Sequence, residues 1–152
     1  MTSSGQSLFE VVVAIAISAL IIVALVSVTS NSIQNSSFSK NKSLASTYAD
    51  QASEWLRGQR DADINSFVAR ATVSSSNAYC LSDLSFTTAV PDPVHDCLVT
   101  IPDTVFTRWV NLNVDTESGK DVITADVTVS WTDSQGVHQV IDSTTLADLR
   151  TR

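Results

Sequence analysis

Residues 8–28 read LFEVVVAIAISALIIVALVSV, a run of 21 residues in which only Glu10, Ser18 and Ser27 are not apolar. A helix of this length rises about 30 Å, which matches the thickness of the hydrocarbon core of a bilayer. Glu10 is also the only ionisable side chain in residues 1–39. Because the run has no polar stripe of the kind that a water-soluble helix carries, it predicts a membrane-spanning helix.

The composition of the whole chain narrows the class of protein further. Its 152 residues suffice for one domain of ordinary size. Hydrophobic residues make up 43% and charged residues 16%, which excludes a disordered chain. The formal net charge of -7 argues against direct binding of nucleic acid. The chain has no C-x-x-C motif, and we expect neither a metal site nor a cofactor.

Two simple interpretations of the apolar run meet difficulties. A cleaved secretory signal needs a basic segment before a short apolar core, followed by a small-residue cleavage site. Here no Lys or Arg precedes the core and the core is too long, although Val28-Thr29-Ser30 resembles a cleavage site. A plain single-pass anchor fits the length, but a carboxylate within a spanning helix costs roughly 2.5–3.5 kcal/mol. Glu10 fits such an anchor only if it lies shallow, near the membrane interface.

The residues before the run supply a third interpretation. Residues 5–10 read GQSLFE and are followed by Val, Ala and Ile only, up to residue 17. This pattern resembles the type IV prepilin signal, in which a dedicated peptidase cuts after the Gly and a carboxylate occupies the fifth mature position. The resemblance implies cleavage between Gly5 and Gln6, N-methylation of Gln6, and a role for Glu10 in docking between subunits. The leader lacks the family's usual basic residue, and Gln6 stands where Phe is commonest.

One long helix is expected to continue beyond the apolar run, because no Gly or Pro occurs between Gln6 and Arg57. Its middle is weak: ten of the seventeen residues 27–43 are Ser or Asn, which compete with the backbone for hydrogen bonds, so this part could unwind under strain. Gly58 predicts the end of the helix. A set of apolar residues at helical spacing predicts a face that packs on a core, with a ligand groove as the alternative. This face comprises Phe38, Ala45, Tyr48, Ala52, Trp55 and Leu56.

The C-terminal half changes to the period of β-strands. Alternation over residues 106–114 and 122–131, and less regularly over 137–145, predicts three strands joined by Gly-containing turns at 117–120 and 133–136. Such a meander needs cover for its apolar face, and the amphipathic half of the long helix can provide it. The sequence therefore predicts an α+β fold: a long N-terminal helix, membrane-spanning in its first half, packed on a small antiparallel sheet of three or more strands. This sheet region is similar to that of minor type IV pilins and type II secretion pseudopilins.

The two cysteines, Cys80 and Cys97, bound a Pro-containing segment that is similar to the cysteine-bounded loop of a subset of those proteins. We expect a disulfide between them, because the membrane helix would place this region outside the cytoplasm, where such bridges persist. Two independent buried thiols are the alternative. His95 and His138 are the only histidines, and no G-x-S-x-G motif accompanies them, so neither a catalytic nor a metal site is predicted.

The resemblance implies a structural filament subunit, a minor pilin or pseudopilin, and not an enzyme. It divides the chain into a leader (1–5), a transmembrane and assembly helix (6–30) and an extracytoplasmic head (31–152). The implied partners are other pilin subunits, the prepilin peptidase, the inner-membrane assembly platform and ATPase, and membrane lipid before assembly. The implied location is a single-pass membrane protein with its head outside the cytoplasm, and then a filament on the cell surface or in the periplasm.

Two alternatives from other classes stay open: an anchored binding or adhesion domain that does not polymerise, and an exported enzyme with a cleaved signal. The topology also carries a conflict. Lys40 and Lys42 follow the apolar run and no basic residue precedes it, which by the positive-inside rule favours a cytoplasmic head. We expect the head outside, because both lysines lie a dozen residues or more beyond the run and because the cysteines and the prepilin-like signal agree.

Overall fold

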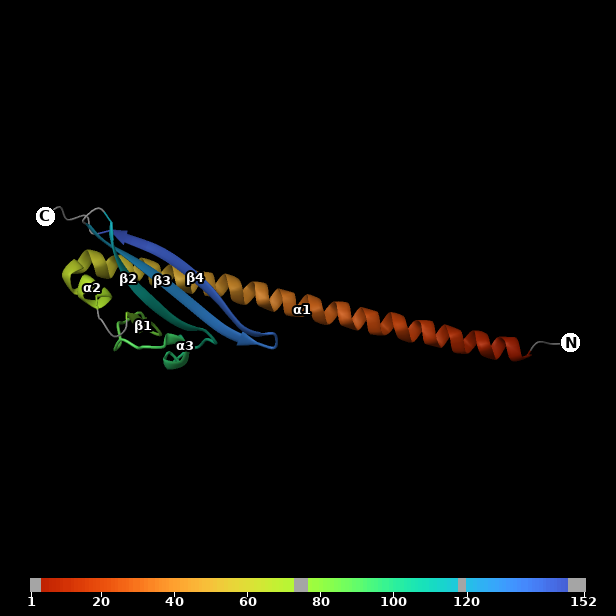
Figure 1. The fold of residues 1–152 in the computed structure, drawn as a ribbon. Helices are drawn as coiled ribbons and strands as arrows, with labels where there is room; N and C mark the ends of the chain where they lie inside the picture. The colour runs from red at the N-terminus through yellow and green to blue at the C-terminus, as the bar shows by residue number, and fades with distance from the viewer. Residues whose placement is uncertain (1–3, 73–76, 118–119, 148–152) are drawn as a thin grey trace. The chain divides into compact units, whose positions relative to one another are not determined.

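The computed structural model describes residues 4–72, 77–117 and 120–147, and among them the side chains of residues 8–72, 77–114 and 122–146. The chain divides into two compact units, Met1–Lys40 and Asn41–Arg152. Helix α1 (Ser4–Ala62) is the described part of the first unit and continues into the second (Figure 1). The second unit contains all the remaining elements.

The first unit is a helix whose apolar side chains face outward. Every described side chain from residue 8 to residue 37 is exposed, with Leu8 at 73% and Leu20 at 71%. The hydroxyls of Ser18, Ser27 and Thr29 each donate to the backbone carbonyl four residues earlier, so these polar groups are satisfied within the helix. The helix is long and apolar enough to cross a membrane, which agrees with the prediction of a spanning segment.

The Ser- and Asn-rich segment 27–43 is helical along its whole length. The predicted end of α1 at Gly58 is wrong, because the helix runs on to Ala62. Gly58 is exposed, and nothing lies near the position that a Cβ would occupy. A Gly inside a helix costs roughly 0.5–1 kcal/mol, yet the helix continues past Gly58 and stops only at Ala62, next to the cap of the following helix at Asp63.

A second helix, α2 (Ile64–Ala71), begins directly after α1. Asp63 separates the two helices with an extended backbone. Its carboxylate accepts hydrogen bonds from the backbone N–H groups of Asn65 and Ser66, which caps the new helix. The chain therefore stops one helix and starts another at a single acidic residue.

The second unit holds one antiparallel sheet with the strand order β1-β2-β3-β4. Its strands are β1 (Ala78–Cys80), β2 (Thr107–Glu117), β3 (Lys120–Asp133) and β4 (Gly136–Ala147). The three predicted strands are confirmed and extend further at both ends, except at the start of β2. The predicted turn at 133–136 joins β3 to β4, with Gly136 at a φ of 122°. The turn at 117–120 includes residues 118–119, which lie outside the described residues.

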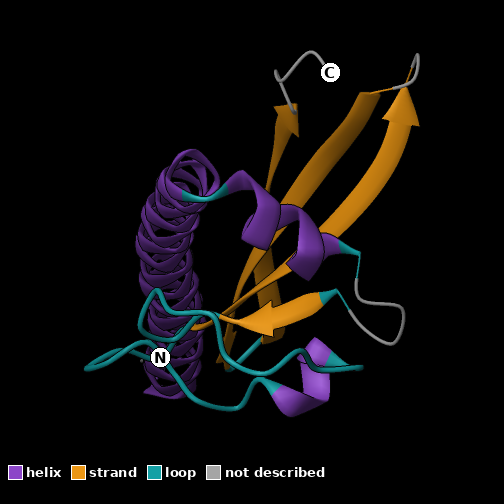
Figure 2. Cartoon of the chain, turned by 90° about the vertical axis from the view of Figure 1, so that its left-hand side faces the viewer, coloured by secondary structure: helices purple, strands orange, loops and turns teal. Residues whose placement is uncertain are grey.

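Residues 41–62 of α1, together with α2, cover one face of the sheet (Figure 2), so the α+β fold is confirmed. The predicted helix face is largely confirmed, since Ala45, Ala52 and Leu56 are fully buried, and Ala49 joins them. Tyr48 and Trp55 are half-buried. On the sheet side, every second residue of β3 is apolar and buried, as the alternation over residues 122–131 predicted; these are Ile123, Ala125, Val127, Val129 and Trp131.

A buried arginine of the sheet forms hydrogen bonds to both the helix and a loop. Arg108 of β2 is only 2% exposed. Its Nε donates to the carbonyl of Leu81 (2.8 Å) and its Nη1 to the carbonyl of Tyr48 in α1 (2.9 Å). Burial lowers the pKa of the guanidinium below its ordinary value, while Tyr48 and Asp83 act in the opposite direction. A second polar link joins the same layers, because the Ser53 hydroxyl of α1 donates to the Asp142 carboxylate of β4.

Candidate functional site

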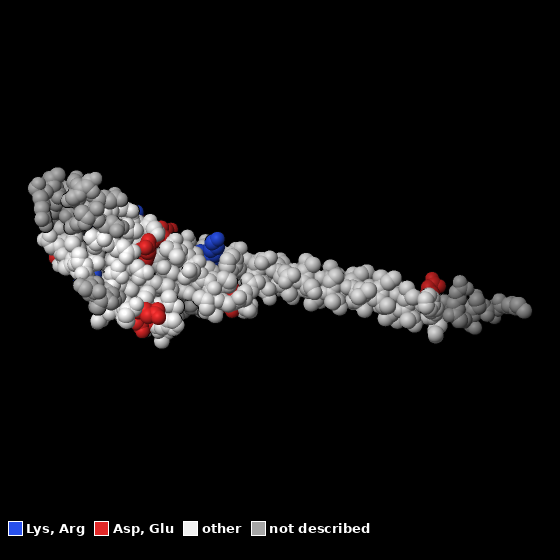
Figure 3. Space-filling view, viewed as in Figure 1, with Lys and Arg blue, Asp and Glu red and all other residues white. Residues whose placement is uncertain are grey.

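The residues of the prepilin-like signal lie at the start of α1. Gly5 and Gln6 belong to its first turns, and their side chains lie outside the described residues. Glu10 is described and exposed. On the face shown in Figure 3, the described part of the first unit is almost free of charged side chains, in agreement with the sequence, in which Glu10 is the only charge in residues 8–39.

The chemistry that this helix offers is simple: a large apolar surface with one carboxylate near its N-terminal end. Among the described residues, Glu10 has no ion pair. In hydrocarbon, a carboxylate is stable only if it is protonated or meets a cation. The helix can therefore bind an apolar environment that also supplies one positive group.

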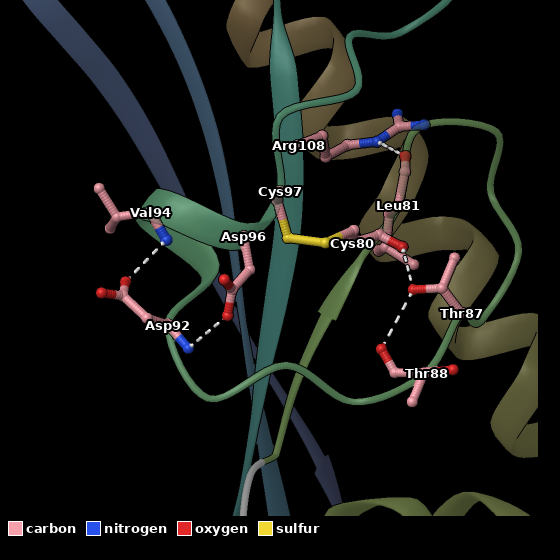
Figure 4. Close-up of a disulfide and its surroundings, with 9 residues drawn as sticks. All are labelled: Cys80, Leu81, Thr87, Thr88, Asp92, Val94, Asp96, Cys97 and Arg108. Atoms are coloured by element: carbon pink, nitrogen blue, oxygen red, sulfur yellow. Dashed lines mark hydrogen bonds between the residues drawn. A yellow bond between two sulfur atoms is a disulfide. The ribbon is translucent and has the colours of Figure 1, made fainter.

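The second candidate region is the loop between the two cysteines. A disulfide joins Cys80, at the end of β1, to Cys97, at the end of the short helix α3 (Pro93–Asp96), with the two Cα atoms 5.3 Å apart (Figure 4). The predicted disulfide is present, and the alternative of two independent thiols is wrong. The bridge therefore fixes both ends of the loop.

Short-range hydrogen bonds order the second half of this loop, as Figure 4 shows in part. Asp92 caps α3 by accepting from the Val94 backbone N–H, and Asp96 in turn accepts from the Asp92 N–H. His95 lies on the outside of α3, with its Nδ1 2.7 Å from an Asp92 carboxylate oxygen. The hydrogen bond from His95 lowers the pKa of Asp92 below its ordinary value.

An aromatic side chain anchors the first half of the loop. The ring of Phe86 lies against Trp55 of α1 (centroids 4.9 Å apart) and Tyr79 of β1 (5.3 Å), and more distantly against Phe67 of α2 (6.3 Å). These edge and tilted contacts are the favourable geometries for aromatic pairs. This anchor was not predicted from the sequence. The available signal was that Phe86 is the only Phe, Tyr or Trp between the two cysteines.

Phe86 also makes a cation–π contact. The guanidinium carbon of Arg70, in the last turn of α2, lies 4.5 Å from the centre of the Phe86 ring. The Tyr79 hydroxyl donates to the backbone carbonyl of Arg70 (2.9 Å), and burial raises the pKa of that hydroxyl although Arg70 acts in the opposite direction. Arg70 borders an open pocket of about 450 Å³, whose lining comprises Ser66, Ala69, Arg70, Tyr79, Thr87 and Ala89. No sequence pattern pointed to this pocket.

The two histidines lie in different places. His95 is on α3, whereas His138 is on β4, where its Nε2 is 2.9 Å from the Asp133 carboxylate and its ring lies 5.3 Å from that of Trp131. Within the described part of the chain, no group of three or more His, Cys, Asp or Glu side chains is placed to hold a metal ion. The histidines therefore act as local partners of carboxylates.

Comparison with known proteins gives no information about the function of this chain. No protein-family model matches the sequence, and neither a curated protein nor a solved structure matches it. The features that can carry a functional argument are therefore the residues 5–10 with the apolar helix behind them, and the surface of the second unit.

Proposed function

We propose that this chain is a structural subunit of a type IV pilin-like filament, either a minor pilin of a type IV pilus or a pseudopilin of a type II secretion-like system. The observation that carries the proposal is the coincidence of the GQSLFE pattern at residues 5–10 with an outward-facing apolar helix. Their combination gives the helix a cleavage point, a single carboxylate and a surface that needs an apolar partner.

The proposed mechanism uses the helix twice. In the precursor, the apolar side chains insert into the membrane and anchor the second unit outside the cytoplasm. A prepilin peptidase then removes residues 1–5, which creates a new amine at Gln6, the position that is methylated. An assembly platform with its ATPase transfers the subunit from lipid to the filament, where the same apolar side chains pack against the helices of other subunits.

Glu10 has a defined role in this mechanism. Cleavage after Gly5 places a positive amine at Gln6, and a neighbouring subunit in the filament presents the same group. Pairing of Glu10 with the neighbour's amine would offset the cost of burying both charges, while loss of one partner would leave the other charge unpaired in an apolar bundle. Glu10 thus sets the register of an incoming subunit more than it adds stability.

The experiment that tests the proposal is the N-terminal sequence of the mature protein. The full chain is co-expressed with a prepilin peptidase, purified from membranes and analysed by mass spectrometry. We expect a chain that begins at Gln6. Gly5→Leu is the matched variant: it should remain uncut and still sit in the membrane, because a Cβ at this position obstructs close approach of the backbone to the peptidase.

The alternative functions give different N-termini in the same experiment. A chain that keeps Met1 or begins at Thr2 identifies an anchored binding or adhesion domain that does not polymerise. A chain that begins near residue 30 identifies an exported protein with a cleaved signal. Either result, or normal cleavage of the Gly5→Leu variant, contradicts the filament proposal.

A further inference from the structure

Arg70 stands apart from the other described arginines. Two of those pair with carboxylates of their own helix, Arg57 with Glu54 and Arg60 with Asp61. Arg108 is buried and donates to backbone carbonyls. Arg70 makes no ion pair with any described residue, and it borders the open pocket. Its cationic group is therefore available to a ligand.

The guanidinium of Arg70 is also held in position. The ring beneath it, Phe86, is fixed by three other aromatic rings and belongs to a loop closed by the Cys80–Cys97 disulfide. A cation over a fixed ring gains the cation–π attraction and loses rotamer freedom before any ligand arrives. Because the guanidinium is already held in place, binding a ligand costs less conformational entropy.

The rest of the lining restricts the chemistry of the ligand. The three hydroxyls of the pocket already donate to acceptors in the protein: Ser66 to the Asp63 carboxylate, Tyr79 to the Arg70 carbonyl, and Thr87 to the Cys80 carbonyl. Among the described lining residues, the Arg70 guanidinium is therefore the charged group that can still donate hydrogen bonds to a ligand. The hydroxyl oxygens can still accept hydrogen bonds, and the two alanines leave room for a backbone.

We propose that the Arg70 pocket binds the carboxylate of an Asp or Glu side chain in a peptide segment of a partner protein. The planar guanidinium matches a carboxylate with two parallel hydrogen bonds. Among the described lining residues Arg70 is the one cation, and residues 71–107, which supply the other side of the pocket, contain no Lys or Arg. Peptide N–H groups can donate to the oxygens of Ser66 and Thr87.

An acidic sugar would present the same carboxylate, but the lining favours a peptide. Sugars gain much of their affinity by stacking on an open aromatic face. Here Arg70 covers Phe86, and Tyr79 is only 3% exposed. The inference goes beyond the filament proposal and does not depend on it, since the pocket lies wholly in the second unit.

The test uses the full chain in detergent micelles with the disulfide intact. The Nε–Hε signals of the arginines are followed by NMR, and the Arg70 signal is assigned by its loss in Arg70→Lys. The probes are acetyl-Gly-Glu-Gly-amide, its Gln analogue, galacturonate and acetate. We expect the Glu peptide to shift the Arg70 signal saturably, with roughly tenfold weaker binding of the Gln peptide, because a charge-assisted pair is replaced by a neutral one.

Matched variants separate the pocket from general charge effects. Arg70→Gln should abolish the binding, and Arg70→Lys should weaken it because the fork geometry is lost. Arg57→Gln, which removes an exposed arginine outside the pocket, should leave it unchanged. Phe86→Leu should weaken binding by releasing the guanidinium, provided that tryptophan fluorescence shows a folded second unit. The absence of a saturable shift, equal binding of the Gln peptide or of acetate, or tighter binding of galacturonate would overturn the proposal.

Discussion

Reduction of the Cys80–Cys97 disulfide should lower the stability of the second unit while leaving its fold unchanged. The two cysteines are 17 residues apart. In the chain-entropy model, closing a loop of that length removes about 3 kcal/mol of conformational freedom from the unfolded state. The native loop has further anchors, Phe86 in the aromatic cluster and the Leu81 carbonyl on Arg108, so the reduced protein should still fold.

Tryptophan fluorescence of the full chain in detergent is the appropriate measurement, because Trp55, Trp109 and Trp131 all lie in the second unit. A loss of about 3 kcal/mol corresponds to a melting temperature lower by roughly 10–20 °C for a unit of this size. The double variant Cys80→Ala, Cys97→Ala is the control, since a reductant should not alter its melting temperature. Two titratable thiols in untreated protein, or a melting temperature insensitive to reductant, would refute the reasoning.

Three further perturbations have expected outcomes. Glu10→Ala should insert in membranes, because losing a charge eases partitioning, but should be largely absent from sheared filaments. Arg108→Met should lower the free energy of unfolding by about 2 kcal/mol in denaturant titrations, since two carbonyls lose their donor. The hydrogen bond from the backbone N–H of Gln135, and after it the hydrogen bond with the His138 side chain, lowers the pKa of Asp133 below its ordinary value of 3.8. The stabilisation from ionised Asp133 is therefore present above pH 3.8 and is lost as the pH falls through the lowered pKa, so Asp133→Asn should flatten this part of an acid-unfolding curve.

Much of the fold was predictable because burial follows simple periods. The apolar run at residues 8–28 and the alternation in β3 predicted a helix and a half-buried strand, and both are present. The prediction that was wrong concerned the end of a helix, which depends on a few individual residues. Gly58 was expected to end α1, but the helix continues to Ala62, and Asp63 then caps the start of the next helix.

The parts that sequence patterns missed are held by contacts between distant segments. Strand β1 has three residues, too few for a periodic signal, and it exists because it pairs with β2 about thirty residues later. The pocket beside Arg70 requires α2, β1 and the disulfide-closed loop to converge. Arg70, Tyr79 and Thr87 share no spacing that would have linked them in the sequence. Such sites become visible only when the tertiary structure is known.

The apolar surface of the first unit could be buried either in lipid or in a bundle of similar helices. Glu10 distinguishes these two environments. The exposed apolar side chains gain as much from lipid as from a bundle of similar helices, because both remove them from water. The carboxylate does not gain equally. The hydrocarbon core of a bilayer offers it no cation, whereas a bundle of cleaved chains offers an amine from each neighbour. If the chain is cut after Gly5, the free energy of Glu10 therefore favours the bundle over the membrane, which gives a physical reason for one carboxylate to be kept in an otherwise uncharged helix.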